Sequence, residues 1–160
     1  MNRSELERTY VQHRQGLYAL ALSITRCAQG ADDAVHEAFT RLCAKATNIE
    51  SDPVAYVFAS VRNAAVEQLR RRKFVESPAS LFNGHAPDPR IEAERAERDA
   101  SLRRAVDNLP DEQRETVVLK VYAGLTFEQI AAVSGTPLQT TAARYRRALE
   151  KLKSAFGEKP

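Results

Sequence analysis

Several residue types that mark enzymes, metal centres and membrane proteins are scarce in this sequence. It contains no Trp, two Cys and three His, and the Cys and His residues have no metal-ligand spacing. It has no glycine-rich phosphate loop and no nucleophile elbow. No apolar run has the length of a signal peptide or a membrane span. We therefore expect a soluble, cytoplasmic, non-enzymatic protein with no metal, no cofactor and no membrane insertion.

The cysteines and histidines suggest structural roles. Cys27 and Cys43 lack a secretory context, which favours a reducing cytosol, and each is expected to be a small buried residue. His13, His36 and His85 are scattered along the chain, so an enzyme is the most remote of the functions considered.

Residues that favour β-strands are also sparse. Aromatic residues make up 7% of the chain, whereas Ala, Leu, Glu, Arg and Gln are plentiful. The length of 160 residues suits one ordinary domain or two small ones. The expected fold class is all-α.

Charge is distributed unevenly around a small net value of +3. Residues 1–75 hold 11 Lys/Arg and 8 Asp/Glu, residues 76–100 hold 3 and 6, and residues 101–160 hold 10 and 7. Two basic ends around an acidic middle fit two nucleic-acid-binding lobes on a linker, although chance could produce the same counts.

The N-terminal half predicts three amphipathic helices. Apolar residues at spacings of three and four run over residues 6–24, and Gly30 is expected to end this helix. Asp32 or Asp33 can cap the second helix. Asp52-Pro53 starts the third, because Asp can accept free amide bonds and Pro suits the first turn.

The middle of the chain predicts a linker and two further helices. Residues 77–89 contain three prolines and an Asn-Gly pair, so no long element can cross them. A helix is expected from about Arg90 to Leu109. Another starts at Pro110 and stops at Gly124.

Two capping signatures near the C-terminus predict a helix-turn-helix. Thr126 with Gln129 and Thr136-Pro137 with Gln139 each place a hydroxyl and an amide where a helix begins. Between them, Gly135 allows a tight turn. A short helix, 127–133, followed by a longer one from residue 137 is the helix-turn-helix layout.

The longer helix has two different faces. One side is expected to be the inner face and carries Leu138, Thr141, Tyr145, Ala148, Leu149 and Leu152. The outer face, with Arg144 on its flank, carries Gln139, Thr140, Ala143, Arg146 and Arg147. Arginine can contact guanine or phosphate in a major groove, so this face is predicted to bind DNA. The alternative is a helical hairpin whose arginines only face solvent.

At this point the sequence resembles the extracytoplasmic-function group of bacterial sigma factors. Residues 108–115 (NLPDEQRE) and 124–131 (GLTFEQIA) are similar to the C-terminal domain of that family. Residues 31–42 are similar to its polymerase-gripping helix, and 53–56, 61–65 and 69–72 to its promoter-melting helix.

The resemblance implies two helical domains without catalytic chemistry. An N-terminal domain, residues 1–75, would bind core RNA polymerase and open the −10 promoter element. A linker, 76–95, would lead to a C-terminal domain, 96–160, that binds the −35 element. An anti-sigma factor is the further partner that the resemblance implies.

The resemblance also implies roles for individual residues. Contacts with core polymerase fall on Asp32, Asp33, Val35, Glu37 and Phe39, which alternatively form a capped helix that buries its own core. Contacts with the melted −10 strand fall on Asn48, Arg62, Asn63, Arg70, Arg71, Arg72 and Lys73. Asn63 and the loop 48–52 would bound a pocket for an extruded base, whereas without the resemblance Asn63 is a surface residue.

Some positions depart from the family pattern. Cys43 stands where the family often has Trp, and Thr141 replaces the usual Val or Ile. Ala142 and Ala143 replace the basic and serine residues at the start of the recognition helix. We therefore expect −35 recognition to depend on Arg146, Arg147 and DNA shape. The competing hypothesis is a stand-alone helix-turn-helix regulator of operator DNA, which would leave the N-terminal arginine cluster unexplained.

Overall fold

The computed structural model describes residues 1–45, 49, 51–71 and 93–156, with side chains of 93–96 left out. The all-α prediction is confirmed, and the described part of the chain contains no strand. In chain order the elements are α1 (Arg3–Thr25), α2 (Ala28–Ala44), α3 (Pro53–Arg71), α4 (Ala93–Asp107), α5 (Asp111–Val117), the π-helix η1 (Val118–Tyr122), α6 (Phe127–Ser134) and α7 (Leu138–Ala155). No helix among these is both long and apolar enough to cross a membrane.

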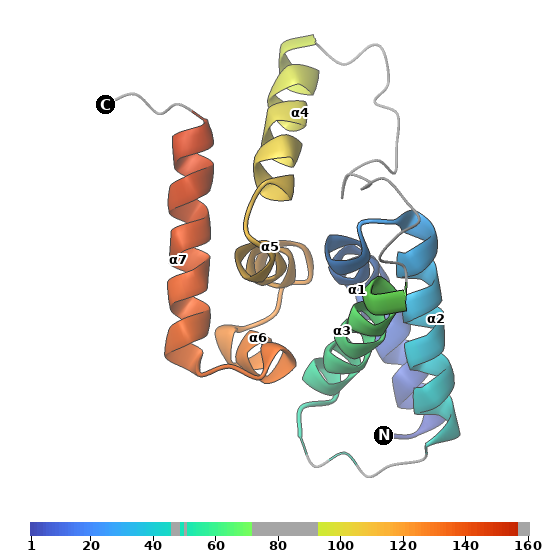
Figure 1. Ribbon diagram of the computed structural model, residues 1–160. Coiled ribbons are helices and arrows are strands. Elements are labelled where there is room, and N and C mark those ends of the chain that lie inside the picture. Colours follow the sequence, from blue (N-terminus) through green and yellow to red (C-terminus); the bar gives the residue numbers. More distant parts are fainter. Residues whose placement is uncertain (46–48, 50, 72–92, 157–160) are drawn as a thin grey trace.

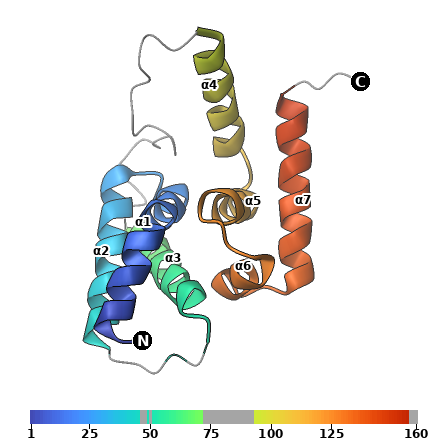
Figure 2. The same cartoon turned by 180° about the vertical axis from the view of Figure 1, so that it is seen from behind.

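The helices form two lobes that lie side by side (Figures 1 and 2). Helices α1–α3 pack together as the N-terminal lobe, around fully buried side chains that include Leu17, Leu20 and Phe58. Elements α4 to α7 form the C-terminal lobe, in which α5 packs against α7 and α6 joins them at one end.

The junction between α1 and α2 differs from the prediction. Helix α1 ends at Thr25 because Arg26 takes the left-handed conformation, with φ of 57°. The Sγ atom of Cys27 then accepts a hydrogen bond from the amide of Gly30 at 3.4 Å and caps α2. Gly30, Asp32 and Asp33 therefore lie inside α2, and their expected roles as helix stop and caps were wrong.

The two cysteines also differ from each other. Cys27 is buried as expected, since its thiol is held at the start of α2. Cys43 is exposed near the end of the same helix, so its predicted burial was wrong. The Cys43 side chain lines a groove between α1 and α2.

Helix α3 begins as the sequence predicted. The Oδ1 atom of Asp52 accepts hydrogen bonds from the amides of Val54 at 2.9 Å and Ala55 at 3.4 Å. Pro53 is the first helical residue, where its missing N–H leaves no intrahelical bond unmade.

A π-helical turn follows α5 and was not predicted. The amide of Ala123 bonds to the carbonyl of Val118 at 3.1 Å, which spans five residues instead of four. The segment then stops, as expected, at Gly124, whose φ is 69°. Helix α4 ends at Asp107, two residues before the predicted Leu109, and its predicted start at Arg90 lies outside the described residues.

One of the two predicted helix-turn-helix caps is present. Thr126 Oγ1 accepts from the amide of Gln129 at 3.1 Å, and Gln129 Oε1 accepts from the amide of Thr126 at 2.9 Å. Gly135 turns the chain with φ of 66°. The second predicted cap was wrong, because Thr136 Oγ1 lies 3.0 Å from Thr141 Oγ1 and α7 starts after Pro137 without a side-chain cap.

The two lobes share one hydrophobic core. The buried residues of the N-terminal lobe form a continuous cluster with four from the C-terminal lobe, namely Leu119, Leu125, Ile130 and Val133. A separate small cluster in the C-terminal lobe contains Leu109, Val117 and Ala148. The predicted lobes are therefore packed against each other, which the sequence did not indicate.

Candidate nucleic-acid and polymerase interfaces

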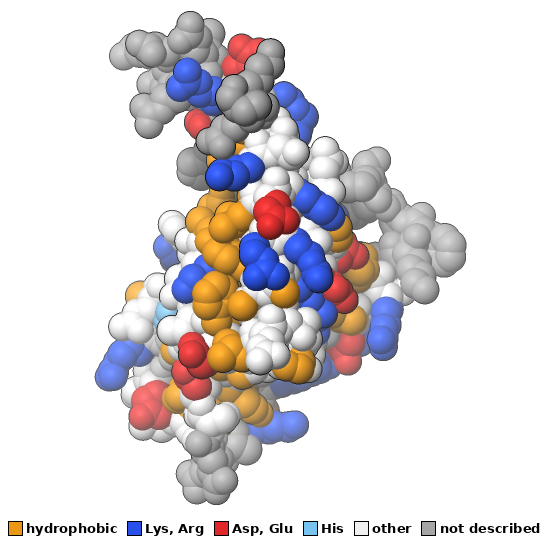
Figure 3. All heavy atoms as spheres, turned by 90° about the vertical axis from the view of Figure 1, so that its left-hand side faces the viewer, with side chains coloured by type: hydrophobic (Ala, Val, Ile, Leu, Met, Phe, Trp, Pro, Cys, Tyr) orange, Lys and Arg blue, Asp and Glu red, His pale blue; other side chains and the backbone are white. Residues whose placement is uncertain are grey.

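Helix α7 presents a basic outer face. Thr141 and Ala148 are buried on its inner side, as predicted. On the outer face Gln139, Arg146 and Arg147 are exposed, whereas Thr140 and Ala143 are partly buried. Figure 3 views this side of the C-terminal lobe, where Lys and Arg side chains lie among apolar ones.

Two leucines of α7 lie differently from the predicted two-sided helix, and an ion pair holds Arg144 on its flank. Arg144 is held against α5, because its Nη2 atom lies 3.4 Å from Glu112 Oε2 and its side chain is 20% exposed. Leu138 and Leu149 were expected on the inner side but are 45% and 41% exposed. The inner face is therefore narrower than predicted, and apolar atoms flank the arginines.

Ring contacts fix the angle between α6 and α7. The rings of Phe127 and Tyr145 meet edge to face with centroids 5.4 Å apart. The ammonium of Lys120 lies 4.7 Å from the Phe127 ring centroid. These contacts join both helices of the helix-turn-helix to η1, so the basic face is held on a rigid support.

Helix α3 carries the second set of predicted DNA contacts. Asn63 is exposed, while Arg62 is turned toward the C-terminal lobe, where its Nε atom lies 2.6 Å from Glu115 Oε1. Arg70 and Arg71 are exposed at the end of α3, with Arg71 3.9 Å from Glu67. Asn48, Arg72 and Lys73 lie outside the described residues.

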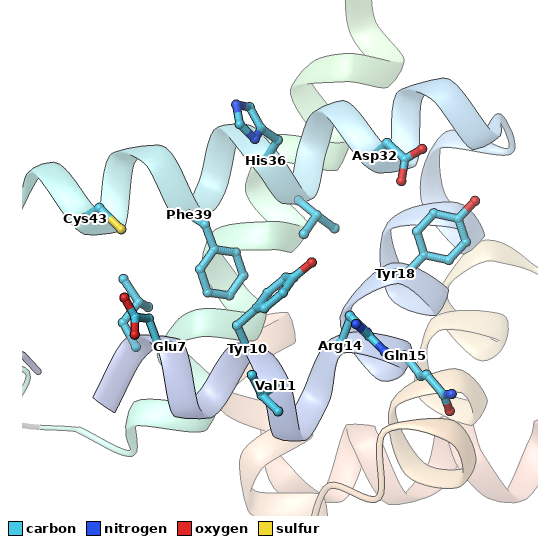
Figure 4. Close-up of a pocket in the computed structure, with 12 residues that line it drawn as sticks. Glu7, Tyr10, Val11, Arg14, Gln15, Tyr18, Asp32, His36, Phe39 and Cys43 are labelled. Atoms are coloured by element: carbon cyan, nitrogen blue, oxygen red, sulfur yellow. The ribbon is translucent and has the colours of Figure 1, made fainter. Parts of the chain in front are cut away.

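A groove of about 730 Å³ runs between α1 and α2 (Figure 4). Three predicted polymerase contacts line it: Asp32, Val35 and Phe39. The ring of Tyr10 meets the ring of Phe39 edge to face with centroids 5.0 Å apart. The groove is thus largely apolar, with charged residues at its ends.

The α1 wall of this groove was not predicted from the sequence. Tyr10, Arg14 and Tyr18 all line it, and Tyr10 is 36% exposed. The sequence signal for this wall was Tyr10, an aromatic residue at the border of the amphipathic stripe of α1. Burial, together with the nearby Asp32 carboxylate and Cys27, raises the pKa of the Tyr18 hydroxyl, so this group is a neutral donor and acceptor at pH 7.

The other two predicted polymerase contacts do not line the groove. The Glu37 carboxylate binds Arg41 on its own helix and accepts a hydrogen bond at 3.2 Å from Gln68 of α3. Arg41 also lies 3.3 Å from Glu67. Glu37 therefore joins α2 to α3, and Asp33 lies outside the set of lining residues. Within the described ranges no group of His, Cys, Asp or Glu could hold a metal ion.

Known proteins resemble the chain over both lobes. Residues 9–75 match the family description "Sigma-70 region 2", and residues 99–152 match "Sigma-70, region 4". The ECF RNA polymerase sigma factor EcfG of Rhodopseudomonas palustris is 31% identical over 139 residues, which cover 85% of this chain and 76% of that protein.

Other relatives agree with this family. The ECF sigma factor RpoE of Cereibacter sphaeroides is 34% identical over 100 residues, which cover 61% of this chain and 55% of that protein, just over half its length. The fold is shared with a structure of the sigma factor RpoE in complex with the anti-sigma factor NepR from Bartonella quintana, with a TM-score of 0.74, 22% identity, and 99% and 98% of the two chains covered. It is also shared with CnrH in complex with the cytosolic domain of CnrY, with a TM-score of 0.69, 20% identity, and 99% and 92% covered.

The N-terminal three-helix lobe and the C-terminal helix-turn-helix are thus the two regions of a promoter-recognition factor. The chain belongs to the extracytoplasmic-function group of the sigma-70 family of RNA polymerase sigma factors.

Proposed function

We propose that this protein binds core RNA polymerase, directs it to −35 and −10 promoter elements and promotes initiation. The observation that carries the proposal is the presence of two helices with exposed arginines, α3 and α7, one in each lobe of a single chain. A stand-alone regulator would need only the second. The domain boundaries we propose are 1–75 and 96–160, joined by 76–95.

The groove between α1 and α2 is the proposed polymerase site. Its aromatic residues, Tyr10, Tyr18 and Phe39, supply the apolar centre that protein interfaces favour, and Asp32 and Arg14 supply a charged rim. Its two walls come from one compact bundle, so the site is formed before a partner arrives. We propose that Asp32, Val35 and Phe39 contact core polymerase directly. Asp33 would lie at the border of this contact, and Glu37 would position α2 on α3.

The proposed promoter contacts lie on α3 and α7. Arg62, Asn63, Arg70 and Arg71, with Asn48, Arg72 and Lys73, would hold the melted −10 strand through its phosphates and one extruded base. Gln139, Thr140, Ala143, Arg146 and Arg147 would face the −35 duplex, with Arg144 beside them. Because Ala142 and Ala143 stand where the family has basic and serine residues, DNA shape should contribute to −35 recognition.

An anti-sigma factor is the proposed regulatory partner. Of the two structures of the same fold, one contains the sigma factor RpoE with the anti-sigma factor NepR, and the other contains CnrH with the cytosolic domain of CnrY. We further propose that the protein acts in the cytoplasm and uses no catalytic chemistry of its own.

Transcription in vitro tests the proposed function. Transcript starts are first mapped in cells that overexpress the protein. The purified protein is then added to core RNA polymerase on a promoter found in this way. We expect starts that share an upstream and a downstream element, and transcription from such a promoter that depends on the added protein. A protein that binds DNA but neither co-purifies with core polymerase nor supports transcription would be a stand-alone regulator.

Arg147→Ala should weaken binding to the upstream duplex found in this way. One lost base or phosphate contact is expected to cost about 1 kcal/mol, and a phosphate contact would also reduce the salt slope by about one. Fluorescence anisotropy at several salt concentrations measures both. Arg104→Ala, which removes an exposed arginine from α4, is the matched control; an unchanged affinity for Arg147→Ala would exclude this contact.

Phe39→Ala should weaken binding to core polymerase by about tenfold, since a buried aromatic anchor is a common interface hot spot. Phe39 packs on Tyr10 inside the groove, whereas the neighbouring Thr40 is exposed outside it. Thr40→Ala is therefore the control, and biolayer interferometry with immobilised core enzyme is the measurement. Equal affinities of the two variants would place the polymerase site elsewhere.

A further inference from the structure

The first two turns of α7 expose an apolar pair, Leu138 and Ala142, where a recognition helix meets DNA. Leu138 is the first residue of α7, and its side chain is 45% exposed. Ala142 lies one turn later and is also exposed, whereas Thr140 and Ala143 of the predicted outer face are partly buried. The accessible face at the start of α7 is therefore turned toward the apolar pair.

Contacts on the inner side of α7 fix this rotation. Thr141 is 1% exposed, and its Oγ1 atom lies 3.0 Å from Thr136 Oγ1 and 3.3 Å from the carbonyl oxygen of Pro137. The ring contact between Phe127 and Tyr145 holds the next turn of the helix. An α-helix turns by about 100° per residue, so both members of the apolar pair lie on one side of the buried Thr141.

The opposite flank of α7 is covered by α5. The Nη2 atom of Arg144 lies 3.4 Å from Glu112 Oε2, and α5 packs along α7. The apolar pair lies on the uncovered flank. On the face of the C-terminal lobe that carries α7, apolar side chains lie beside those of Lys and Arg (Figure 3).

Polar and basic side chains follow the apolar pair along the same face. Arg146 comes one turn after Ala142, Arg147 is next to it, and both are exposed. Gln139 is exposed at the start of the helix. Guanidinium and amide groups bind phosphates and base edges, so the apolar pair belongs to a surface whose charge suits a DNA duplex.

The apolar pair can recognise one kind of group in a major groove. Leucine and alanine side chains have no hydrogen-bonding atoms, so they cannot read the donors and acceptors of a base edge. The C5-methyl group of thymine is the apolar group that the major groove presents, and apolar side chains pack on it. Residues at the start of a recognition helix are those that meet base edges.

We propose that Leu138 and Ala142 form a thymine-reading surface that packs on C5-methyl groups of the upstream promoter element. Leucine is long enough to reach a methyl group, and the short alanine lets the backbone of α7 come close to the bases. The surface selects bases where neighbouring arginines bind phosphates. This inference rests on the proposed binding of α7 to the −35 duplex and adds the base that it selects.

Replacing thymine with deoxyuridine removes only the C5-methyl group and tests this surface directly. The protein, bound to core RNA polymerase, selects duplexes from a random library, and each thymine of the selected upstream element is then replaced in turn. We expect at least one replacement to weaken binding by about fourfold, the value of one buried methyl group. Competition against the unmodified duplex measures the ratio of affinities.

Leu138→Ala tests whether the leucine makes this contact. The variant should bind the unmodified duplex about fourfold more weakly and lose the deoxyuridine effect at its own thymine, because both changes remove the same contact. Leu149→Ala is the matched control, since Leu149 is 41% exposed on the same helix but lies about 16 Å further along it. The control should keep both the affinity and the deoxyuridine effect.

The outcomes separate this inference from the proposed function. A selected element without thymine, or one in which no deoxyuridine weakens binding, would overturn the thymine-reading surface and leave the proposed function intact. A deoxyuridine effect that is unchanged in both Leu138→Ala and Ala142→Ser would also overturn it. A protein that selects no duplex with core polymerase would overturn the proposed function and this inference together.

Discussion

Replacing Leu119 with alanine is expected to lower the free energy of unfolding by about 2–5 kcal/mol, the range for a fully buried leucine. Leu119 belongs to the C-terminal lobe but is 0% exposed within the core cluster shared with the N-terminal lobe. The cavity should therefore weaken both lobes. Urea unfolding measures the change, followed by circular dichroism for the whole chain and by a local probe placed in each lobe.

Leu149→Ala provides the matched comparison, because the same atoms are removed from a side chain that is 41% exposed on α7. Its effect should be about 1 kcal/mol or less. If Leu119→Ala shifted only the probe in the C-terminal lobe, the two lobes would have separate stabilities and the shared core would contribute little to either.

Arg114→Met is expected to cost about 3 kcal/mol, since a charged donor is lost from several buried carbonyls. The Arg114 guanidinium donates to the carbonyls of Leu109 at 2.7 Å, Asp107 at 3.3 Å and Ser23 at 3.3 Å. Its side chain is 7% exposed, so water cannot fully replace these bonds. Methionine keeps the apolar stem and leaves the oxygens without a donor.

Two companion variants separate charge from geometry at this position. Arg104→Met removes an exposed arginine from α4 and should change stability by less than about 0.5 kcal/mol. Arg114→Lys keeps the positive charge but cannot direct several donors at once, and should be nearly as destabilising as Arg114→Met. A fully stable Arg114→Lys variant would show that charge alone is what the site requires.

Local chemistry made some elements predictable. The cap at Asp52-Pro53 and the capping box at Thr126 depend on atoms within three residues, and both were predicted from the sequence. The junction after α1 was not, because it depends on a left-handed Arg26 and a thiol cap at Cys27, for which residue preferences give no signal. The cap expected at Thr136 is absent, because its hydroxyl bonds to the hydroxyl of Thr141 instead.

Features that depend on distant contacts were beyond sequence patterns. In the sequence Gly16 is only a residue that disfavours a helix. The structure explains it, because a Cβ atom at this position would lie 2.9 Å from Ala123. The resemblance placed Arg62 among DNA contacts but said nothing about Glu115. The polymerase groove was half predicted, through Asp32, Val35 and Phe39, because its α1 wall carries residues that also suit an ordinary helix surface.

Little energy is needed to keep the two lobes packed against each other, because they belong to one chain. Two lobes of one chain meet at an effective concentration of about 1 mM, so an interface with an intermolecular dissociation constant of about 0.1 mM would be closed about ten to one. Such an interface would be undetectable between separate lobes at micromolar concentrations. A partner that favours the open form by about 1.4 kcal/mol would cancel the tenfold bias. The Arg62–Glu115 ion pair, the Gln129–Asp52 hydrogen bond and the close approach of Gly16 to Ala123 can therefore be individually weak and still hold the two lobes together.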